Sequence, residues 1–290
     1  MKRIKLINQI LRGVVIGIAN IIPGVSGGTM MVSMGIYDTL IHCITHLFSE
    51  FKKSVKTLLP YAIGMLIGIM ALASLLSFLF ERYPLPTNTA FIGLILGGLA
   101  PLLRKIERKK VNPVSVIVFI VFFAVVIWMA LAGPRQNAES VEINIGTILI
   151  LVVMGAIASA TMIIPGVSGS MMLMLLGYYT PVLNALNALK TAIFSADLAA
   201  MGAPLAVLLP FVVGVALGIF GIAKLIEWFI ARFPTPTYCG VLGLVLASPV
   251  AILIRTNMTG VSVWTVAAAV ATFVIGFIAA RLLEKGSAKS

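Results

Sequence analysis

The chain has 290 residues, of which 60% are hydrophobic and 10% are charged. A soluble domain is about half apolar and about a quarter charged, so this composition excludes an ordinary soluble protein and predicts an integral membrane protein. The net charge of +12 on so apolar a chain excludes a nucleic-acid binder. The excess of Lys and Arg instead indicates how the chain is oriented in the membrane. It also favours anionic membrane lipids as partners.

The first apolar stretch is interrupted by the octapeptide IIPGVSGG, Ile21–Gly28. The apolar arms before and after it are each about 20 Å long if helical, which is too short to cross a hydrocarbon core of about 30 Å. Adjacent Pro and Gly break the helix between the arms and allow a tight reversal. The pattern therefore predicts a re-entrant helical hairpin over residues 10–41, approximately.

Three apolar stretches long enough to cross the membrane follow this hairpin. The second half then repeats the order, beginning with a hairpin around IIPGVSGS, Ile163–Ser170. We expect a first repeat over residues 1–140 and a second over residues 141–290. The predicted segments are a hairpin at about 10–41 with spans at about 58–80, 89–103 and 113–132, and a hairpin at about 146–186 with spans at about 206–230, 238–254 and 261–283.

An ungapped alignment supports this duplication. Gly17–Tyr37 and Ser159–Tyr179 match at 10 of 21 positions, and RYPLPT, Arg82–Thr87, recurs as RFPTPT, Arg232–Thr237. The matched Pro, Gly and Arg positions go beyond shared apolar composition, so the sequence predicts an internal repeat.

The number of spans in each half fixes the expected orientation. A hairpin returns to its own side and three spans are an odd number, so the two repeats have inverted topology. Lys and Arg are concentrated on the side of the two termini, which predicts that both termini are cytoplasmic. The fold class is thus an all-α polytopic membrane protein with two inverted repeats, each a re-entrant hairpin plus three transmembrane helices.

Broken helices within inverted repeats are typical of secondary transporters, in which free backbone N–H groups face an anionic substrate. The alternative is that Pro, Gly and Ser serve only close packing and kinks. Because the motif occurs twice, we expect both tips to contact substrate. The predicted substrate-binding residues at the tips are Pro23, Gly24, Val25, Ser26, Gly27, Gly28, Thr29, Pro165, Gly166, Val167, Ser168, Gly169 and Ser170.

Arg82 and Arg232 each end a long span and precede a Pro-x-Pro-Thr turn. A guanidinium binds phosphate or carboxylate in a bidentate manner, so both are candidate substrate ligands. The alternative is an arginine that anchors its helix at the interface.

Charged residues within apolar segments are candidates for coupling to protons or sodium. Lys224 and Glu227 share one helical face inside the expected span at about 206–230, and Asp38 follows the first hairpin. A local ion pair between Lys224 and Glu227 is the alternative. His42 and His46 have helical metal-ligand spacing, but no acid lies between them, so we expect no metal site there and no cofactor.

The doubled PGVSGG and PGVSGS motifs, each followed by Gly-x-Tyr, and the RYPLPT and RFPTPT pair resemble the polyprenyl-phosphate translocase family, the PopT group. The resemblance runs from about Gly13 to Leu283 and implies undecaprenyl phosphate as substrate. It also implies return of this lipid from the outer to the inner leaflet of the bacterial cytoplasmic membrane for reuse in cell-wall synthesis. One departure is Ser170, where the first motif has Gly28.

Two other functions stay open on the sequence. A transporter or channel for a small anion would use the same hairpin tips but would need a closed aqueous path. An enzyme acting on lipid phosphates would need an acid or His near a tip, and the chain offers no Walker loop and only two His residues. We therefore expect a transporter and not an enzyme.

Overall fold

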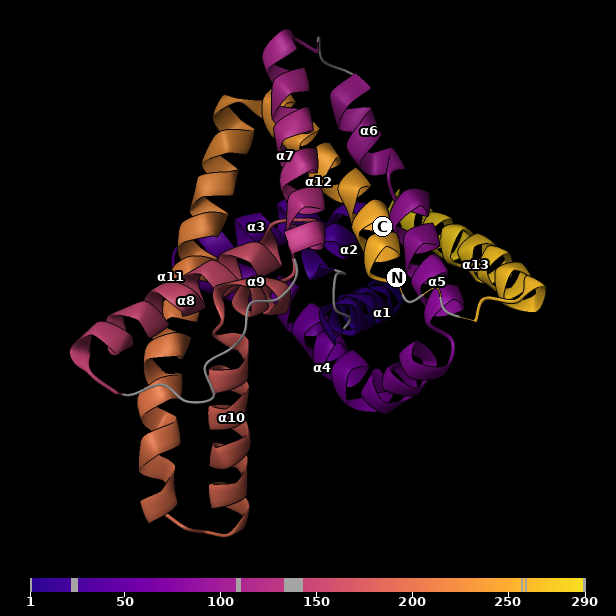
Figure 1. The fold of residues 1–290 in the computed structure, drawn as a ribbon. Coiled ribbons are helices and arrows are strands. Elements are labelled where there is room, and N and C mark those ends of the chain that lie inside the picture. Colours follow the sequence, from indigo (N-terminus) through magenta and orange to yellow (C-terminus); the bar gives the residue numbers. More distant parts are fainter. Residues whose placement is uncertain are drawn as a thin grey trace.

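The computed structural model describes residues 2–21, 26–107, 111–132, 143–256, 258 and 260–288. Within these ranges the chain is helical, with no strand, which confirms the all-α prediction. Figure 1 labels the helices along the chain. They are α1 (Lys2–Ile21), α2 (Gly27–Ser33), α3 (Tyr37–Thr45), α4 (Phe51–Arg82), α5 (Pro84–Gly97), α6 (Ala100–Glu107), α7 (Pro113–Ala132), α8 (Ile145–Ile163), α9 (Gly169–Leu176), α10 (Tyr179–Phe194), the 3₁₀ turn η1 (Ala199–Met201), α11 (Gly202–Arg232), α12 (Pro234–Arg255) and α13 (Val263–Ala288).

Six helical segments among the described residues are long and apolar enough to cross a membrane, so the protein is a multi-pass membrane protein. Five of them cover expected spans. The sixth is α8, which the sequence suggested was only a hairpin arm, and α1 is likewise longer than its expected arm. The α1 helix is longer because it continues into the polar N-terminal segment, where Lys, Arg and Gln are good helix formers.

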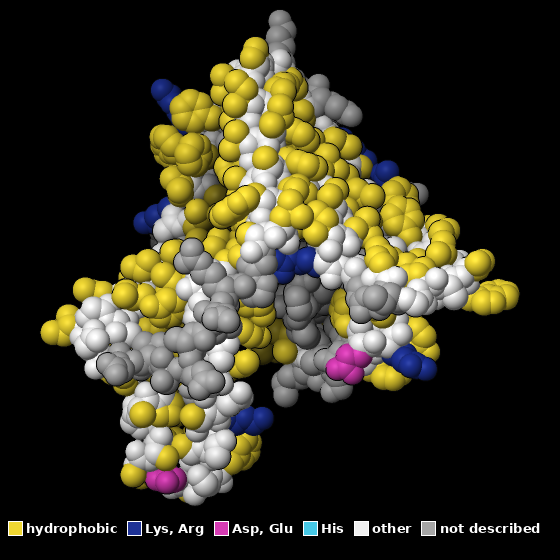
Figure 2. All heavy atoms as spheres, viewed as in Figure 1, with side chains coloured by type: hydrophobic (Ala, Val, Ile, Leu, Met, Phe, Trp, Pro, Cys, Tyr) yellow, Lys and Arg dark blue, Asp and Glu magenta, His cyan; other side chains and the backbone are white. Residues whose placement is uncertain are grey.

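Membrane-facing surfaces are apolar, as a lipid environment requires. On α7 the side chains of Ile117, Ile120 and Trp128 are 60%, 56% and 67% exposed. Figure 2 shows such hydrophobic side chains covering the arm of the molecule that α7 and its neighbours form. Transfer of these side chains into water would be unfavourable, so this surface lies in lipid.

Both octapeptides interrupt the helices, as predicted. Ile164 ends α8 in an extended conformation because it precedes Pro165, and Gly166 has a φ of +82°. In the first half α1 ends at Ile21 and Ser26 is the N-cap residue of α2. Each break is followed by two helices rather than one, and the pair α9 and α10 is bent by 112°.

The same helix pairs form in both halves. Helix α1 packs along α4 in the first half, and α8 packs along α11 in the second. Gly64 and Gly214 occupy matched places in these pairs, where a Cβ would collide with the carbonyl oxygens of Ile10 and Val152. These two glycines therefore serve close helix packing.

Two further helix pairs each combine one helix from each half. Helix α5 packs against α13, and α7 packs against α12, so each of these pairs joins one half to the other. The buried core lies where α2, α5 and α12 meet, around fully buried Met30, Ile95 and Val245. The two breaks therefore lie within one continuous core rather than in separate domains.

One helix contact is present in only one of the two halves. Helix α3 packs against α11 of the other half, whereas its counterpart α10 packs against α11 and makes at most slight contact with α4 in the described structure. In Figure 1, α10 and the adjoining part of α11 extend together away from the central helices α1, α2 and α9. The two halves share a scaffold but differ in arrangement.

Candidate functional site

The two breaks meet in the interior of the protein. The backbone N–H of Gly166 donates to Thr29 Oγ1 at 2.6 Å, and both groups are buried. The hydroxyl of Ser26 donates to the carbonyl oxygen of Ile164 at 3.3 Å. Residues more than 130 positions apart in the chain are thus bonded directly across the centre of the molecule.

The first break segment, Pro23–Thr29, uses most of its described polar groups within the protein. Pro23, Gly24 and Val25 lie outside the described residues. The N–H of Gly27 donates to Asn20 Oδ1 at 3.2 Å, and the N–H of Gly28 donates to Ser26 Oγ at 3.2 Å. Thr29 is fully buried and accepts from the second break. This segment is therefore largely a structural element.

The second break segment, Pro165–Ser170, leaves more of its polar groups available. Ser168 is the N-cap residue of α9, but its side chain makes no capping hydrogen bond. Its hydroxyl oxygen instead lies 2.9 Å from that of Ser170. A helix N-terminus with N–H groups that no side chain caps, beside two hydroxyls, attracts an anion.

A pocket of about 290 Å³, here called the polar pocket, lies against both breaks. Its lining includes the polar side chains of Asn20, Ser26, Ser159, Ser168 and Ser170. Helices α10 and α11 contribute apolar side chains to the same lining. These are Val182, Leu183, Leu186, Phe211 and Val215. The pocket can therefore hold a molecule with a polar head and an apolar chain.

A second pocket, here called the apolar pocket, lies on the other side of the second break. It has a volume of about 350 Å³, is lined by Ile164 and Pro165, and extends along α7, α11 and α12. Among its lining residues, Phe229 and Phe233 flank Arg232 in sequence. It offers little hydrogen bonding, so it suits hydrocarbon rather than a charged group.

Of the predicted tip residues that are described, most line one of these pockets. Ser26, Val167, Ser168, Gly169 and Ser170 line the polar pocket, and Pro165 lines the apolar pocket. Gly27, Gly28, Thr29 and Gly166 line neither pocket and take part in the hydrogen bonds that join and shape the breaks. Sequence reasoning did not identify Ser159 or Tyr179, although both line the polar pocket.

The two candidate arginines lie apart from the polar pocket. Arg82 is the last residue of α4 and Arg232 is the last residue of α11, and both are exposed. Neither lines either pocket. The structure thus places them at helix ends and does not bring them to the breaks.

Asp38 belongs to a small polar cluster at the contact of three helices. Its carboxylate pairs with Lys105 of α6 and accepts a hydrogen bond from the hydroxyl of Tyr238 of α12 at 3.0 Å. Neither partner was identified from the sequence. Asp38 therefore links α3 to α6 and α12.

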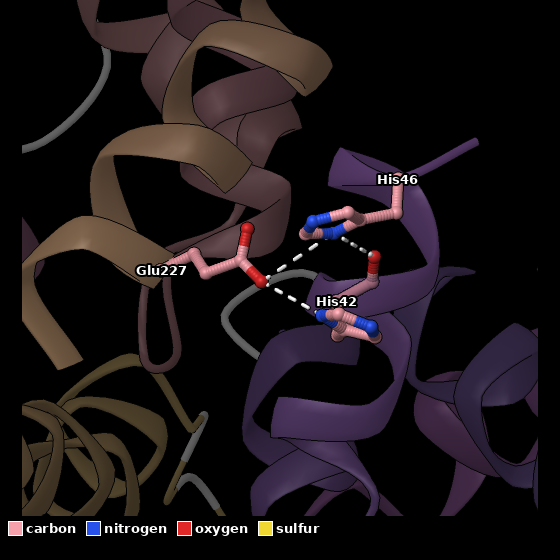
Figure 3. Close-up of side chains that lie close together, drawn as sticks. All are labelled: His42, His46 and Glu227. Carbon is pink, nitrogen blue, oxygen red and sulfur yellow. Dashed lines mark hydrogen bonds and ion pairs between the residues drawn. The ribbon is translucent and has the colours of Figure 1, made fainter. Parts of the chain in front are cut away.

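Glu227 on α11 points toward α3 (Figure 3). Its Oε1 lies 2.8 Å from His42 Nδ1 and 3.6 Å from His46 Nδ1. Within the described structure no ion pair joins it to Lys224, so the alternative of a local pair is not formed. His42 and Glu227 are 185 residues apart, and no spacing rule could have connected them.

The chain is similar to known proteins over almost its whole length. It is 30% identical over 261 residues to a polyprenyl-phosphate transporter of Vibrio cholerae serotype O1, covering 85% of this chain and 77% of the relative. It is 31% identical over 297 aligned positions to a polyprenyl-phosphate transporter of Staphylococcus aureus strain NCTC 8325, covering 100% of both. No solved structure matches it significantly.

Residues 16–270 match a family described as undecaprenyl phosphate translocase-like. The names of this family and of both relatives describe transporters and not enzymes. This agrees with the absence of enzyme motifs in the sequence and with the resemblance carried by the doubled octapeptide. The chain therefore belongs to the undecaprenyl phosphate translocase-like family.

Proposed function

We propose that the protein moves undecaprenyl phosphate from the outer to the inner leaflet of the bacterial cytoplasmic membrane, so that the lipid is reused in cell-wall glycan synthesis. The main support is the polar pocket, whose lining combines serine hydroxyls and the N-terminus of α9 with apolar side chains of α10 and α11. The names of both relatives supply the substrate class.

The physical problem for such a transporter is the lipid head group. A phosphate with one to two negative charges does not cross hydrocarbon unaided, whereas its isoprenoid tail can stay in lipid throughout. A polar route for the head group alone is sufficient. Ser168, Ser170 and the N-terminus of α9 provide donors for phosphate oxygens, and Val182, Leu183 and Leu186 pack against the first isoprene units.

We further propose that the two halves are inverted repeats, that each break is the tip of a re-entrant hairpin, and that both termini are cytoplasmic. The shared pairing of α1 with α4 and of α8 with α11 supports the duplication. The 112° bend between α9 and α10 supports a re-entrant path. The concentration of Lys and Arg on the side of the termini supports the orientation.

Transport then follows alternating access. The contact of α3 with α11, which α10 and α4 hardly reproduce, supports a state with one mouth closed and the other open. As the halves rock, the contact of α3 with α11 would open and an equivalent contact of α10 with α4 would form. The polar pocket would then open to each side of the membrane in turn. Arg82 and Arg232, at the ends of α4 and α11, receive the phosphate at the two mouths in this scheme.

The driving ion, a proton or sodium, requires a group whose occupancy changes between the two states. Asp38 is the candidate that we retain, because its contacts with Lys105 and Tyr238 join α3 to α6 and α12. Lys224 is exposed and Glu227 is engaged by His42, so they are weaker candidates.

A reconstituted flipping assay tests this function. Labelled undecaprenyl phosphate is built into both leaflets of proteoliposomes, and a membrane-impermeant phosphatase is added outside. Active protein should make the inner-leaflet pool accessible. The Ser168→Ala/Ser170→Ala variant should be slow, and Ser195→Ala, an exposed serine that bonds only its own helix, should behave as wild type.

The same vesicles separate lipid transport from the rival function. A transporter of small anions would release entrapped inorganic phosphate and leave the labelled lipid in its original leaflet. That result would contradict the proposal. Lipid movement without loss of entrapped phosphate supports it.

A further inference from the structure

We propose that His42, His46 and Glu227 form a binding site for a divalent transition metal of the zinc class, which joins α3 to α11. The three side chains converge from two helices that belong to different halves of the chain (Figure 3). The first-half helix contributes both imidazoles, and the second-half helix contributes the carboxylate.

The three side chains are close enough for one tetrahedral ion to bind them, if His46 Nδ1 gives up its contacts with the carbonyl oxygen of His42 at 3.2 Å and with Thr45 Oγ1 at 3.0 Å. One ligand atom from each residue can be chosen so that all three lie within 4.8 Å of one another. The distances from Glu227 Oε1 to the two Nδ1 atoms are 2.8 and 3.6 Å. Zn–N bonds of about 2.0–2.1 Å place the ligand atoms of a tetrahedral site about 3.4 Å apart, and the observed distances lie on either side of this value.

The ligands are also the right type. His42 lies on α3 and His46 is the C-cap residue of this helix, one turn later, with ring centroids 4.1 Å apart. Two imidazoles and one carboxylate form a common zinc ligand set that leaves a fourth position for water or another ligand. The side chains are 48%, 38% and 32% exposed, so an ion can enter from water.

The site has no counterpart in the other half. Continuing the 142-residue offset of the first alignment beyond Tyr37 places Asn184 opposite His42 and Ala188 opposite His46. The 150-residue offset between RYPLPT and RFPTPT places Ser77 opposite Glu227. A metal ion bound here would therefore stabilise the contact between α3 and α11 only, and would hold the protein in the arrangement seen in the structure. This consequence for transport rests on the proposed function, whereas metal binding itself does not.

Metal binding is measured directly on the full-length protein, purified without a His tag and stripped of metal. Co²⁺ is the probe, because its visible spectrum reports tetrahedral coordination, and Zn²⁺ is the competitor. We expect one Co²⁺ per chain, displaced by Zn²⁺. Changes outside the ligand shell alone weaken sites 10–100-fold, so His42→Ala, His46→Ala and Glu227→Gln should each weaken binding by at least about tenfold.

Cys43→Ser is the matched control, because Cys43 lies on the same helix between the two histidines but is buried. It should bind Co²⁺ as wild type does. Thermal unfolding without metal identifies any variant that has lost its fold, and His42→Gln replaces His42→Ala in that case. Absence of stoichiometric Co²⁺ binding by wild type, or wild-type binding by all three ligand variants, would overturn the site.

The flipping assay then separates the two proposals. Zn²⁺ should slow lipid movement by wild type and leave Glu227→Gln unaffected. Metal binding in a protein that moves no lipid would overturn the proposed function and leave the site intact. Lipid movement without Co²⁺ binding would do the reverse.

Discussion

The two break segments have nearly the same sequence but different hydrogen bonds. In the first, the N–H groups of Gly27 and Gly28 are taken by Asn20 and Ser26, and Thr29 accepts from Gly166. In the second, the hydroxyls of Ser168 and Ser170 pair with each other, with no other side-chain bond among the described residues, and both serines line the polar pocket. A duplicated motif has thus become one segment that supports the structure and one that is available to substrate.

Whole helices likewise show features that both halves share and features that differ between them. The matched glycines give both halves the same close packing of long helices, whereas the polar contacts of α3 with α11 occur on one side only. Shared apolar packing preserves the scaffold, and polar side chains make the two sides different. The predictions below test this division, beginning with the scaffold.

The largest effect is expected at the packing glycines. Gly64→Ala and Gly214→Ala each place a Cβ against backbone of the neighbouring helix, so each should lower the free energy of unfolding by about 3 kcal/mol. Denaturation in detergent measures the change. Gly221→Ala, at an open position on α11, is the control and should have little effect. A large difference between Gly64 and Gly214 would contradict a shared scaffold.

The hydrogen bond between the breaks should have the next largest effect. Thr29→Val keeps the side-chain shape but leaves the buried N–H of Gly166 without an acceptor, which should lower the free energy of unfolding by about 2 kcal/mol. Thr191→Val, whose exposed hydroxyl bonds only its own helix, is the matched control. Equal stability of the two variants would remove the structural role of the first break.

Ser170→Gly gives the second break the residue that the first has at Gly28. Loss of this hydroxyl should weaken undecaprenyl phosphate binding by about tenfold, or about 1.4 kcal/mol, and hardly change stability. Native mass spectrometry of the lipid complex measures the affinity. The reciprocal Gly28→Ser should instead destabilise the fold, since a Cβ there would lie 2.6 Å from the carbonyl oxygen of Ile163. Unchanged lipid affinity in Ser170→Gly would remove the Ser170 hydroxyl from the lipid site.

The smallest effect is expected at the arginines. Arg82→Ala and Arg232→Ala should each slow flipping by about threefold, because exposed charges at helix ends contribute only modestly to binding an anion. The reconstituted assay gives both rates under the same conditions. Unchanged transport in both variants would remove the arginines from the mechanism and leave them as interfacial anchors.

Much of the local structure could be predicted from the sequence because it depends on local rules. Pro165 forces the preceding Ile164 out of the helix, as the Pro-Gly pair predicted. The Gly-x-Tyr that follows each break was recognised only as part of the doubled motif. In the structure both of its glycines, Gly35 and Gly177, have positive φ values, +67° and +80°. Lipid-facing helices could be predicted because a run of about twenty apolar residues is long enough to cross the hydrocarbon core as a helix.

Contacts between distant residues could not be predicted from the sequence. Helix α5 packs against α13 and α7 packs against α12, so helices of different halves are paired. The spacing of residues along the sequence does not indicate this packing. The partner of Glu227 was sought three residues away at Lys224, but it is His42. The hydrogen bond from Gly166 to Thr29 could likewise not be predicted, although both residues were candidate substrate-binding residues.

Photocrosslinking tests the central claim most directly, namely that the lipid phosphate rests in the polar pocket beside the second break. A polyprenyl phosphate with a photoreactive group in its first isoprene units is bound to the protein, irradiated and mapped by peptide mass spectrometry. We expect adducts on Met162, Leu183 and Leu186, lost when unlabelled undecaprenyl phosphate is added but not when inorganic phosphate is added. Adducts confined to the apolar pocket, or labelling that undecaprenyl phosphate does not reduce, would contradict the account.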